Sequence, residues 1–220
     1  MKIEIKLTSD NSHTLFVPEL NETYHSRHGA IQEAKHVFID AGLRFLNNEE
    51  KLNVLEVGFG TGLNALLSCV YATENKVNLK YTGVELNPVT IDIIKQLNYT
   101  DYIKGNAQKL FLELHNSKWE EASQISEYFN LNKVKLPILS VKGIANFDVV
   151  FYDAFGPNVQ GEMWGKDVFE MLYKVIRPGG VLVTYCAKGV VKRTLKEVGF
   201  KLESLPGPPG KREMTRAVKL

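Results

Sequence analysis

Apolar and polar residues repeat with two different periods along this chain of 220 residues. Beyond residue 48, short apolar runs typical of buried strands are followed by segments whose apolar residues recur every three or four positions, as in helices. The pattern predicts strands at 52–57, 79–84, 131–136, 147–153 and 180–185, and helices at 62–72, 88–97, 164–176 and 189–198. Strands that alternate with helices predict a parallel sheet with right-handed crossovers.

Both ends of the chain depart from this alternation. Residues 2–8 and 13–17 alternate apolar and polar positions about a polar turn, which predicts a hairpin, and a helix is expected at about 29–46. Near the C-terminus, predicted strands at 200–205 and 214–219 are joined by a short Pro/Gly turn and must therefore be antiparallel. The fold class is thus α/β, with a Rossmann-like sheet of seven mostly parallel strands and an antiparallel C-terminal hairpin.

The pattern predicts one domain that spans residues 1–220. It divides into an accessory hairpin and helix at 1–48 and a core at 49–220, with a helical insertion at about 101–128 that contains two short helices, one beginning at Ser117. No apolar run approaches the length of a membrane span and the N-terminus lacks the apolar segment of a signal peptide, so we expect a cytoplasmic protein. Cys69 and Cys186 have no partners at metal-ligand spacing, which predicts buried thiols and no metal site.

Three glycines at alternate positions follow the first strand of the predicted core. They stand in the segment Asn53-Val-Leu-Glu-Val-Gly-Phe-Gly-Thr-Gly-Leu-Asn64, where the backbone can bend tightly against a ligand. The spacing G-x-G-x-G differs from the G-x-G-x-x-G of dinucleotide sites, and Glu56 at the strand end would repel a pyrophosphate. A carboxylate at this point suits a cationic ligand without phosphate, such as S-adenosylmethionine.

Two more acidic residues stand at the ends of predicted strands. Glu85 lies roughly 20 residues beyond the glycine turn, where a carboxylate can accept hydrogen bonds from both ribose hydroxyls. Asp153 ends the run Phe147-Asp-Val-Val-Phe-Tyr-Asp and precedes an irregular Ala-Phe-Gly-Pro loop. At the carboxyl edge of the sheet, Asp153 could hold an amine in line for methyl transfer, although helix or turn capping is the alternative role for these acids.

The net charge of +2 hides an uneven distribution. Residues 174–220 carry eleven Lys and Arg against three Glu, a net charge of +8, and the rest of the chain has −6. A basic C-terminal third beside a cofactor site indicates a polyanionic substrate, and solvated helix faces explain the same charge equally well.

A lone His is more often structural than a ligand, and a Trp that begins an apolar-faced helix fits core packing as well as base stacking. Candidate substrate contacts are Tyr24, His25, Arg27, His28, Glu33, Trp164, Lys188, Lys211 and Arg212.

Three pairs of segments resemble one family. The chain is similar to the methyltransferase domain of the bacterial bifunctional enzyme of tRNA 5-methylaminomethyl-2-thiouridine biosynthesis, and the resemblance runs from the N-terminal hairpin to the last strand. The motifs are His28-Gly-Ala-Ile-Gln-Glu-Ala-Lys-His-Val-Phe38 with Glu56-Val-Gly-Phe-Gly-Thr-Gly-Leu-Asn64, Tyr152-Asp-Ala-Phe-Gly-Pro157 with Glu162-Met-Trp164, and Arg177-Pro-Gly-Gly180 with Gly210-Lys-Arg-Glu-Met214.

The resemblance implies methylation, with S-adenosylmethionine as donor, of 5-aminomethyl-2-thiouridine at the tRNA wobble position. It implies a stand-alone methyltransferase whose aminomethyl substrate is made by a separate upstream enzyme, with tRNA as partner and the oligomeric state open. The residues it assigns to catalysis are Asp153, Phe155 and Pro157. Those assigned to the cofactor are Glu56, Gly58, Phe59, Gly60, Thr61, Gly62, Asn64, Glu85 and Leu86.

One departure from the family pattern concerns the adenine. In relatives, Gly-Asp follows the strand that corresponds to Lys133-Val-Lys135, and the Asp contacts adenine, whereas this chain has Leu136-Pro137. We therefore expect backbone groups or apolar packing to hold the base. Two other functions stay open: an aminopropyltransferase of polyamine synthesis, and a non-catalytic protein that binds S-adenosylmethionine or RNA.

Overall fold

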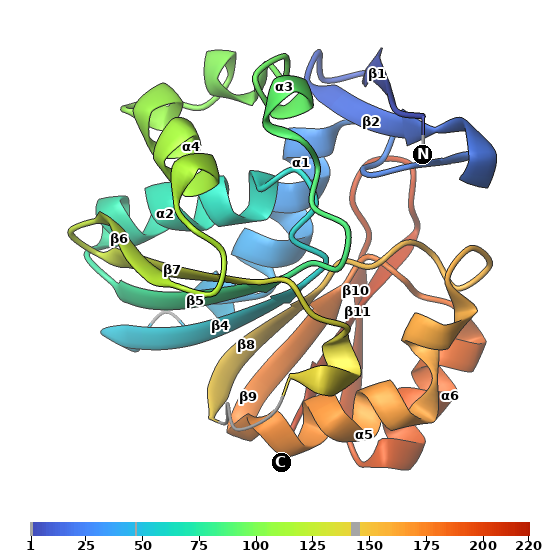
Figure 1. The fold of residues 1–220 in the computed structure, drawn as a ribbon. Coiled ribbons are helices and arrows are strands. Elements are labelled where there is room, and N and C mark those ends of the chain that lie inside the picture. The colour runs from blue at the N-terminus through green and yellow to red at the C-terminus, as the bar shows by residue number, and fades with distance from the viewer. Residues whose placement is uncertain (1, 47, 142–145) are drawn as a thin grey trace.

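An eight-stranded sheet runs through the centre of the computed structural model, which describes residues 2–46, 48–141 and 146–220 (Figure 1). The strand order is β10-β11-β9-β8-β4-β5-β7-β6. Their bounds are β4 Lys51–Val57, β5 Asn78–Val84, β6 Ala122–Ser126, β7 Phe129–Val134, β8 Phe147–Tyr152, β9 Ile176–Thr184, β10 Lys201–Pro206 and β11 Glu213–Val218. The five central strands pair in parallel, which confirms the predicted α/β sheet.

The sheet has one strand more than the seven that the sequence predicts. β6 pairs antiparallel with β7 at the edge of the sheet, in the segment where a second short helix is expected. The helix expected from Ser117 is wrong, because Trp119 instead forms a bridge with Lys133 of β7. Ile125 is the one buried residue of β6, so this strand lacks the apolar run that marks the central strands. The antiparallel pairing of β10 with β11 is confirmed.

Helices cover both faces of the sheet (Figure 1). One apolar cluster packs α1, α2 and α4 against one face, and a second packs α5 and α6 against the other. Alternate residues of β8 enter the two clusters, since Phe151 belongs to the first and Tyr152 to the second. The helices are α1 Ala30–Ala34, α2 Leu63–Asn75, α3 Ile91–Ile94, α4 Ala107–Asn116, α5 Lys166–Val175 and α6 Gly189–Val198, with single 3-10 turns at Pro18–Leu20, Leu43–Leu46, Tyr99–Asp101, Ile138–Ser140 and Gly161–Trp164.

The N-terminal part adds a small sheet with strand order β1-β2-β3, made of β1 Glu4–Leu7, β2 His13–Val17 and β3 Glu22–Thr23. The helix expected at 29–46 is shorter and irregular: α1 continues as a π-helical segment, Lys35–Asp40, before a 3-10 turn. Gly42 lies in this region against β8, where a Cβ would stand 3.0 Å from the Phe151 ring. The same Cβ would stand even closer to the Phe38 carbonyl oxygen, so both the local backbone and the sheet crowd this position. The helix expected at 88–97 is likewise reduced to the four residues of α3.

The chain order of the strands determines where a ligand can bind. From β4 the chain moves outward through β5 to β7, and then returns to the other side of β4 with β8 and β9. The sheet therefore has a topological switch point between β4 and β8, and ligands of open α/β sheets bind at the carboxyl ends of strands at such a point. Cys69 and Cys186 are buried and free, as predicted. Within the described residues, no helix has the length and apolar character needed to cross a membrane.

Candidate active site

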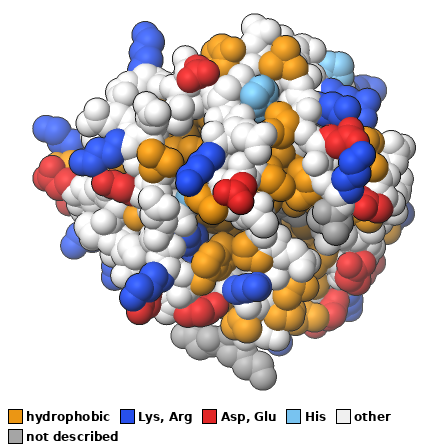
Figure 2. All heavy atoms as spheres, turned by 45° about the horizontal axis from the view of Figure 1, so that its top comes forward, with side chains coloured by type: hydrophobic (Ala, Val, Ile, Leu, Met, Phe, Trp, Pro, Cys, Tyr) orange, Lys and Arg blue, Asp and Glu red, His pale blue; other side chains and the backbone are white. Residues whose placement is uncertain are grey.

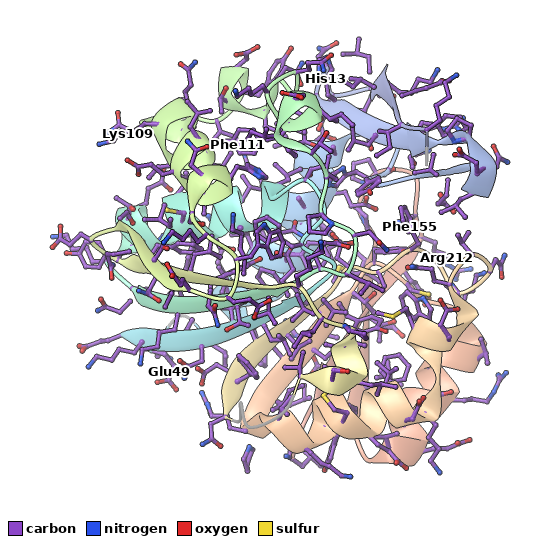
Figure 3. The ribbon with its side chains drawn as sticks, viewed as in Figure 1. His13, Glu49, Lys109, Phe111, Phe155 and Arg212 are labelled. Carbon is purple, nitrogen blue, oxygen red and sulfur yellow. The ribbon has the colours of Figure 1, made fainter. Side chains whose placement is uncertain are left out.

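A cavity of about 1110 Å³ lies at the carboxyl ends of β4, β5, β7 and β8. Its wall combines the glycine turn after β4, Glu85 after β5 and Asp153 after β8 with residues from the N-terminal segment and the β10–β11 turn. The face shown in Figure 2 has apolar side chains gathered through its middle and charged side chains around them. Phe155 and Arg212 both line the cavity. Figure 3 shows them near each other, between the N-terminal strands and the C-terminal helices.

The glycine turn is tied to the ends of two neighbouring strands. The amides of Gly58 and Phe59 both donate to the Val84 carbonyl at the end of β5, at 3.0 and 3.1 Å. Gly58 has a φ of 90°, and a Cβ there would stand 2.6 Å from the carbonyl oxygen of Asp153. Glycine is therefore required for the turn to pass this closely to the end of β8.

Glu85 is held in place by two backbone amides. Its Oε2 accepts a hydrogen bond from Gly60 at 3.1 Å, and its Oε1 accepts one from Asn87 at 2.9 Å. The first of these bonds links the strand-end carboxylate to the glycine turn. Each carboxylate oxygen keeps a further lone pair, so the group can still accept hydrogen bonds from two hydroxyls of a ligand.

Asp153 lies at the end of β8 with its carboxyl group in the cavity wall. Its Oδ2 accepts a 2.8 Å hydrogen bond from the side-chain amide of Asn64, and the same nitrogen donates at 2.9 Å to Oε1 of Glu56. Burial, together with the Glu33 carboxylate, raises the pKa of Asp153 to about 7. A carboxyl group that titrates near neutral pH can accept a proton from an amine or hold one of its hydrogens.

The loop after Asp153 is fixed at two successive carbonyl groups. The hydroxyl of Tyr185 donates to the Ala154 carbonyl at 2.9 Å, and the indole nitrogen of Trp164 donates to the Phe155 carbonyl at 2.8 Å. The ring of Phe155 also meets the Tyr24 ring edge to face, with centroids 5.0 Å apart. These contacts orient the loop, and they engage the two carbonyls that a substrate amine could otherwise use.

An ion pair joins the N-terminal part of the chain to the C-terminal hairpin across the cavity wall. Nζ of Lys211 lies 2.6 Å from Oε1 of Glu33 and 3.9 Å from the centroid of the Tyr185 ring. The other oxygen of Glu33 accepts a 2.7 Å hydrogen bond from the Ser26 amide. Lys211 therefore has two partners inside the site, and its positive charge acts to lower the pKa of Asp153 although the side chain is partly exposed.

Comparison with known proteins identifies the family of this chain. Residues 98–220 match the S-adenosyl-L-methionine-dependent methyltransferase family. The chain belongs to this family. It is also 32% identical over 217 residues to the tRNA 5-methylaminomethyl-2-thiouridine biosynthesis bifunctional protein MnmC of Cupriavidus necator, covering 92% of this chain and 32% of that protein. The resemblance seen in its sequence motifs is thereby confirmed.

Two further relatives agree with the assignment of this methyltransferase. It is 31% identical to the MnmC protein of Leptospira interrogans, over 94% of this chain and 34% of that protein. The crystal structure of MNMC2 from Aquifex aeolicus superposes with a TM-score of 0.83 at 25% identity, over 99% of this chain and 70% of that one. The methyltransferase thus spans about a third of the length of the curated relatives that it matches.

The residues of the methyltransferase fit S-adenosylmethionine. Glu85 could accept hydrogen bonds from two ribose hydroxyls, and the cavity lies beside it and the glycine turn. Next to Glu85, at the end of β7, the wall is apolar, and Leu86, Leu136 and Leu139 are 50%, 39% and 46% exposed although they line the cavity. This is the apolar surface expected for the base in place of a carboxylate. The donor set and cavity size therefore suit a nucleoside with a cationic amino-acid end.

Most of the predicted site residues do meet in this cavity. The catalytic and cofactor candidates that line it are Asp153, Phe155, Pro157, Gly58, Phe59, Gly60, Thr61, Asn64, Glu85 and Leu86. The substrate candidates that line it are Tyr24, His25, Glu33, Lys188, Lys211 and Arg212. The five that do not line it are Glu56, Gly62, Arg27, His28 and Trp164.

The position of Glu56 corrects the expectation of a direct contact with the cofactor's charge. Its side chain is fully buried beneath the wall and reaches the cavity only through Asn64. Burial raises the pKa of Glu56 well above its ordinary value, because removal from water disfavours the charged form of this carboxyl group. Glu56 therefore supports Asn64 by hydrogen bonding and does not itself line the cavity. Gly62 also lies outside the wall, where a Cβ would stand 2.8 Å from Nε2 of His115.

Three substrate candidates have structural environments instead. Trp164 is 6% exposed and packs against Tyr152 with centroids 4.9 Å apart, so base stacking by its ring is wrong. The guanidinium of Arg27 lies 5.6 Å over the Phe16 ring, outside the cavity. His28 is exposed and packs against the β10–β11 turn at Gly210.

His25 lines the cavity but is deeply buried. Its ring lies 3.5 Å from the Thr61 hydroxyl and 3.4 Å from that of Thr14. Burial lowers the pKa of His25 to about 4, so the ring is neutral and acts as a hydrogen-bonding member of the wall.

Tyr185 was not among the residues predicted from the sequence. It contacts both the catalytic loop and Lys211, and burial raises its pKa strongly, so its hydroxyl is a donor at all physiological pH values. Its place at the end of the predicted strand 180–185 was the available signal, because residues at that edge of the sheet face the ligand.

Proposed function

We propose that this chain transfers a methyl group from S-adenosylmethionine to the 5-aminomethyl group of 5-aminomethyl-2-thiouridine at the wobble position of tRNA. Asp153 carries the proposal, because its carboxyl group faces the cavity and its pKa of about 7 lies near physiological pH. The names of the MnmC relatives and of the Aquifex structure supply the substrate class. The product would be 5-methylaminomethyl-2-thiouridine.

Bound S-adenosylmethionine supplies an electrophilic methyl group on a sulfonium. Glu85 and the glycine turn would bind its nucleoside, with the base against Leu136 and Leu139. Asp153 would accept a hydrogen of the substrate amine, so that the nitrogen lone pair points at the methyl carbon of the donor. Phe155 and Pro157 would flank the base that carries the amine. Such positioning can account for about 7–11 kcal/mol of the barrier, so no nucleophile on the protein is needed.

The charges of the cavity wall match a cationic amine attached to an anionic polymer. Among the described residues, seven carboxylates line the cavity, including Glu33, Glu85 and Asp153, against three Lys and Arg. Lys188 and Arg212 are the two of these cations that lie outside the Glu33 ion pair, near the catalytic loop and the β10–β11 turn. We assign them to phosphate contacts, which make RNA binding weaken steeply with salt.

The decisive experiment is to incubate the protein and S-adenosylmethionine with tRNA that carries 5-aminomethyl-2-thiouridine, and then to analyse the nucleosides by mass spectrometry. We expect the starting nucleoside to gain one methyl group. Retention of the starting nucleoside by a protein that binds S-adenosylhomocysteine would reject this substrate. A cytoplasmic setting and a separate enzyme that makes the aminomethyl group belong to the same proposal.

The acidic wall also fits a polyamine, which keeps aminopropyl transfer as the second candidate. That reaction would use decarboxylated S-adenosylmethionine, and putrescine or spermidine would gain an aminopropyl group. A parallel incubation with these two compounds separates the candidates. Formation of a longer polyamine, without methylation of tRNA, would replace the first proposal by the second.

A further inference from the structure

The carboxamide of Asn64 lies between two carboxyl groups that come from different strands. Its nitrogen Nδ2 is 2.9 Å from Oε1 of Glu56 on β4 and 2.8 Å from Oδ2 of Asp153 after β8. An amide nitrogen has two hydrogens, and here each has its own acceptor. The opposite amide orientation would place Oδ1 against both carboxyl groups, so this network determines which way the side chain faces.

The remaining atom of this carboxamide is an acceptor without a donor. Asn64 is 3% exposed and lines the cavity, and Oδ1 has no hydrogen-bond partner among the described residues. A buried carbonyl oxygen without a partner costs free energy unless a ligand or water supplies a hydrogen. Asn64 stands in the first turn of α2, directly after the glycine turn. The unpaired oxygen therefore belongs to the part of the wall that a cofactor would contact.

The expected orientation of the cofactor brings its amino-acid end toward this atom. With the ribose at Glu85 and the base at the end of β7, the rest of the molecule extends toward β4 and β8, where Asn64 and Asp153 lie. The amino-acid end carries an ammonium group, which is a donor with three hydrogens. Glu56 beneath Asn64 is buried and offers that ammonium no direct contact.

We propose that Asn64 is a positioning residue that links the two halves of the reaction, its Oδ1 accepting a hydrogen bond from the ammonium of the cofactor while its Nδ2 holds Oδ2 of Asp153. Oδ1 of Asp153 is then the oxygen left for the substrate amine. Glu56, buried beneath Asn64, is the support that keeps the carboxamide turned this way. The inference rests on the proposed methyl transfer for its second half only, because the first half concerns cofactor binding alone.

Several charged and titratable groups face Asp153 besides Asn64. Glu33 comes from α1, Lys211 from the β10–β11 turn and Glu56 from β4, and Tyr81 of β5 and Tyr185 after β9 lie close enough to interact with the carboxylate. Only Asn64 donates a hydrogen bond to the Asp153 carboxyl group within the described residues. A readout of Asp153 ionisation therefore tests this particular bond when the other groups are left unchanged.

The binding test compares two nucleosides that differ in the amino-acid end. Calorimetry on wild type and Asn64→Ala would use S-adenosylhomocysteine, which has the ammonium, and 5′-methylthioadenosine, which lacks the whole amino-acid end. We expect the variant to bind S-adenosylhomocysteine about tenfold more weakly and 5′-methylthioadenosine within about twofold of wild type. Equal losses for both ligands, or no loss for either, would overturn the inference. Failure of the wild type to bind S-adenosylhomocysteine would overturn it together with the proposed function.

The Asn64→Asp variant keeps a hydrogen-bond acceptor at this position and removes the two N–H donors of the amide. The carboxylate keeps an oxygen for the ammonium but cannot hold both neighbours as the amide does. We expect S-adenosylhomocysteine to bind within about threefold of wild type, and methylation of the tRNA nucleoside to fall about a hundredfold, with the acid limb of the rate profile shifted to higher pH. Full retention of activity would overturn the role toward Asp153. If wild type and Asn64→Ala show the expected binding difference but no tRNA is methylated, the proposed function fails and the binding half of the inference stands.

Asn132→Ala is the matched control. Asn132 on β7 also has a buried Oδ1 with no partner in the described part of the chain, but it does not line the cavity. We expect its removal to leave both ligands and the rate profile unchanged. Thermal unfolding of all variants checks that they are folded. If Asn132→Ala also lost the preference for S-adenosylhomocysteine over 5′-methylthioadenosine, the effect of Asn64→Ala would reflect general stability only.

Discussion

The indole nitrogen of Trp164 donates a 2.8 Å hydrogen bond to the carbonyl oxygen of Phe155. The ring that supplies this bond is buried between Tyr152 and Phe169, with centroids 4.9 and 6.4 Å away. A rigid aromatic cluster on one face of the sheet therefore fixes the loop that carries the proposed catalytic residues. Loop geometry in this protein depends on a side chain that never enters the cavity.

We expect Trp164→Phe to slow methyl transfer about tenfold while S-adenosylhomocysteine binds within about twofold of wild type, because the loop loses an anchor that the cofactor does not touch. Stability should fall by about 2 kcal/mol through the lost hydrogen bond and the smaller ring. Single-turnover kinetics and urea unfolding measure the two effects. Phe169→Leu is the control, since it loosens the same cluster without removing the bond. An equal loss of rate in both variants would contradict a specific role for this anchor.

The central fold was predictable because its signals are local. β4 and β8 are buried along most of their length, so they appear as largely apolar runs, interrupted by polar residues such as Asn53 and Asp148, that end at Val57 and just before Asp153. β6 gave no such signal, because one of its five residues is buried. In the irregular segment after α1, Gly42 lies close to the Phe38 carbonyl and to the Phe151 ring of β8, and the second of these contacts joins residues far apart in the sequence.

The site residues likewise divide into those with a local signal in the sequence and those placed by contacts between distant parts of the chain. The glycine turn, Glu85 and Asp153 were found because each follows a recognisable strand, and the topology brings strand ends together. The contacts of Lys211 with Glu33 and with Tyr185 join residues 178 and 26 positions apart, and no spacing rule connects them. Trp164 could be read as core or as ligand from its helix pattern, and only the packed structure decides for the core.

Asp153→Asn should abolish most activity and stabilise the protein at high pH. The pKa of about 7, against an ordinary 3.8, means that the folded protein keeps a proton which the unfolded chain has released between about pH 4 and pH 7. Wild-type stability therefore falls as pH rises through this window, and the asparagine variant escapes that loss. We expect the rate to fall about a hundredfold or more. The Tm of the variant should exceed that of wild type at about pH 8 and equal it near pH 4. A Tm difference that is independent of pH would show that Asp153 ionises normally.

Glu33→Gln and Lys211→Met should shift the acid limb of the kcat/KM profile in opposite directions. The Glu33 carboxylate raises the pKa of Asp153 and the Lys211 ammonium lowers it. We expect the limb to move to lower pH in Glu33→Gln and to higher pH in Lys211→Met, each on the order of half a pH unit. The measurement is the rate of nucleoside methylation between pH 5 and pH 9. Shifts of the same sign would mean that the ion pair acts on the shape of the site rather than on the charge at Asp153.

The apolar wall at the end of β7 should make the protein tolerant of changes at the purine amino group. Leu136, Pro137 and Leu139 offer no side-chain acceptor, and Pro137 has no backbone N–H. We expect S-inosylhomocysteine, which has a carbonyl in place of the amino group, to bind within about fivefold of S-adenosylhomocysteine. Leu136→Asp should weaken S-inosylhomocysteine more than S-adenosylhomocysteine. Calorimetry that finds a hundredfold preference of the wild type for the adenosyl compound would reveal an acceptor for the amino group.

Lys133 shows how a charge behind the site limits stability. It is 1% exposed on β7, its Nζ donates at 3.0 Å to the His115 carbonyl near the end of α4, and it lies 5.1 Å from the Trp119 ring centroid. Burial lowers the pKa of Lys133 from 10.5 to about 8, so the unfolded chain holds a proton that the folded protein has released between about pH 8 and pH 10.5. Stability should therefore rise with pH across this window.

Lys133→Met should remove this pH dependence. The full charge penalty below pH 8 corresponds to about 3 kcal/mol, and part of it is offset by the helix-end hydrogen bond and the aromatic contact that the variant loses. We expect a net gain of about 1–2 kcal/mol at pH 7 that disappears near pH 10, measured by urea unfolding at both pH values. Lys109→Met on the outer face of α4, where the side chain points away from the molecule (Figure 3), should change stability by less than about 0.5 kcal/mol at either pH. A destabilised Lys133→Met at pH 7 would mean that the contacts with His115 and Trp119 outweigh the cost of burying the charge.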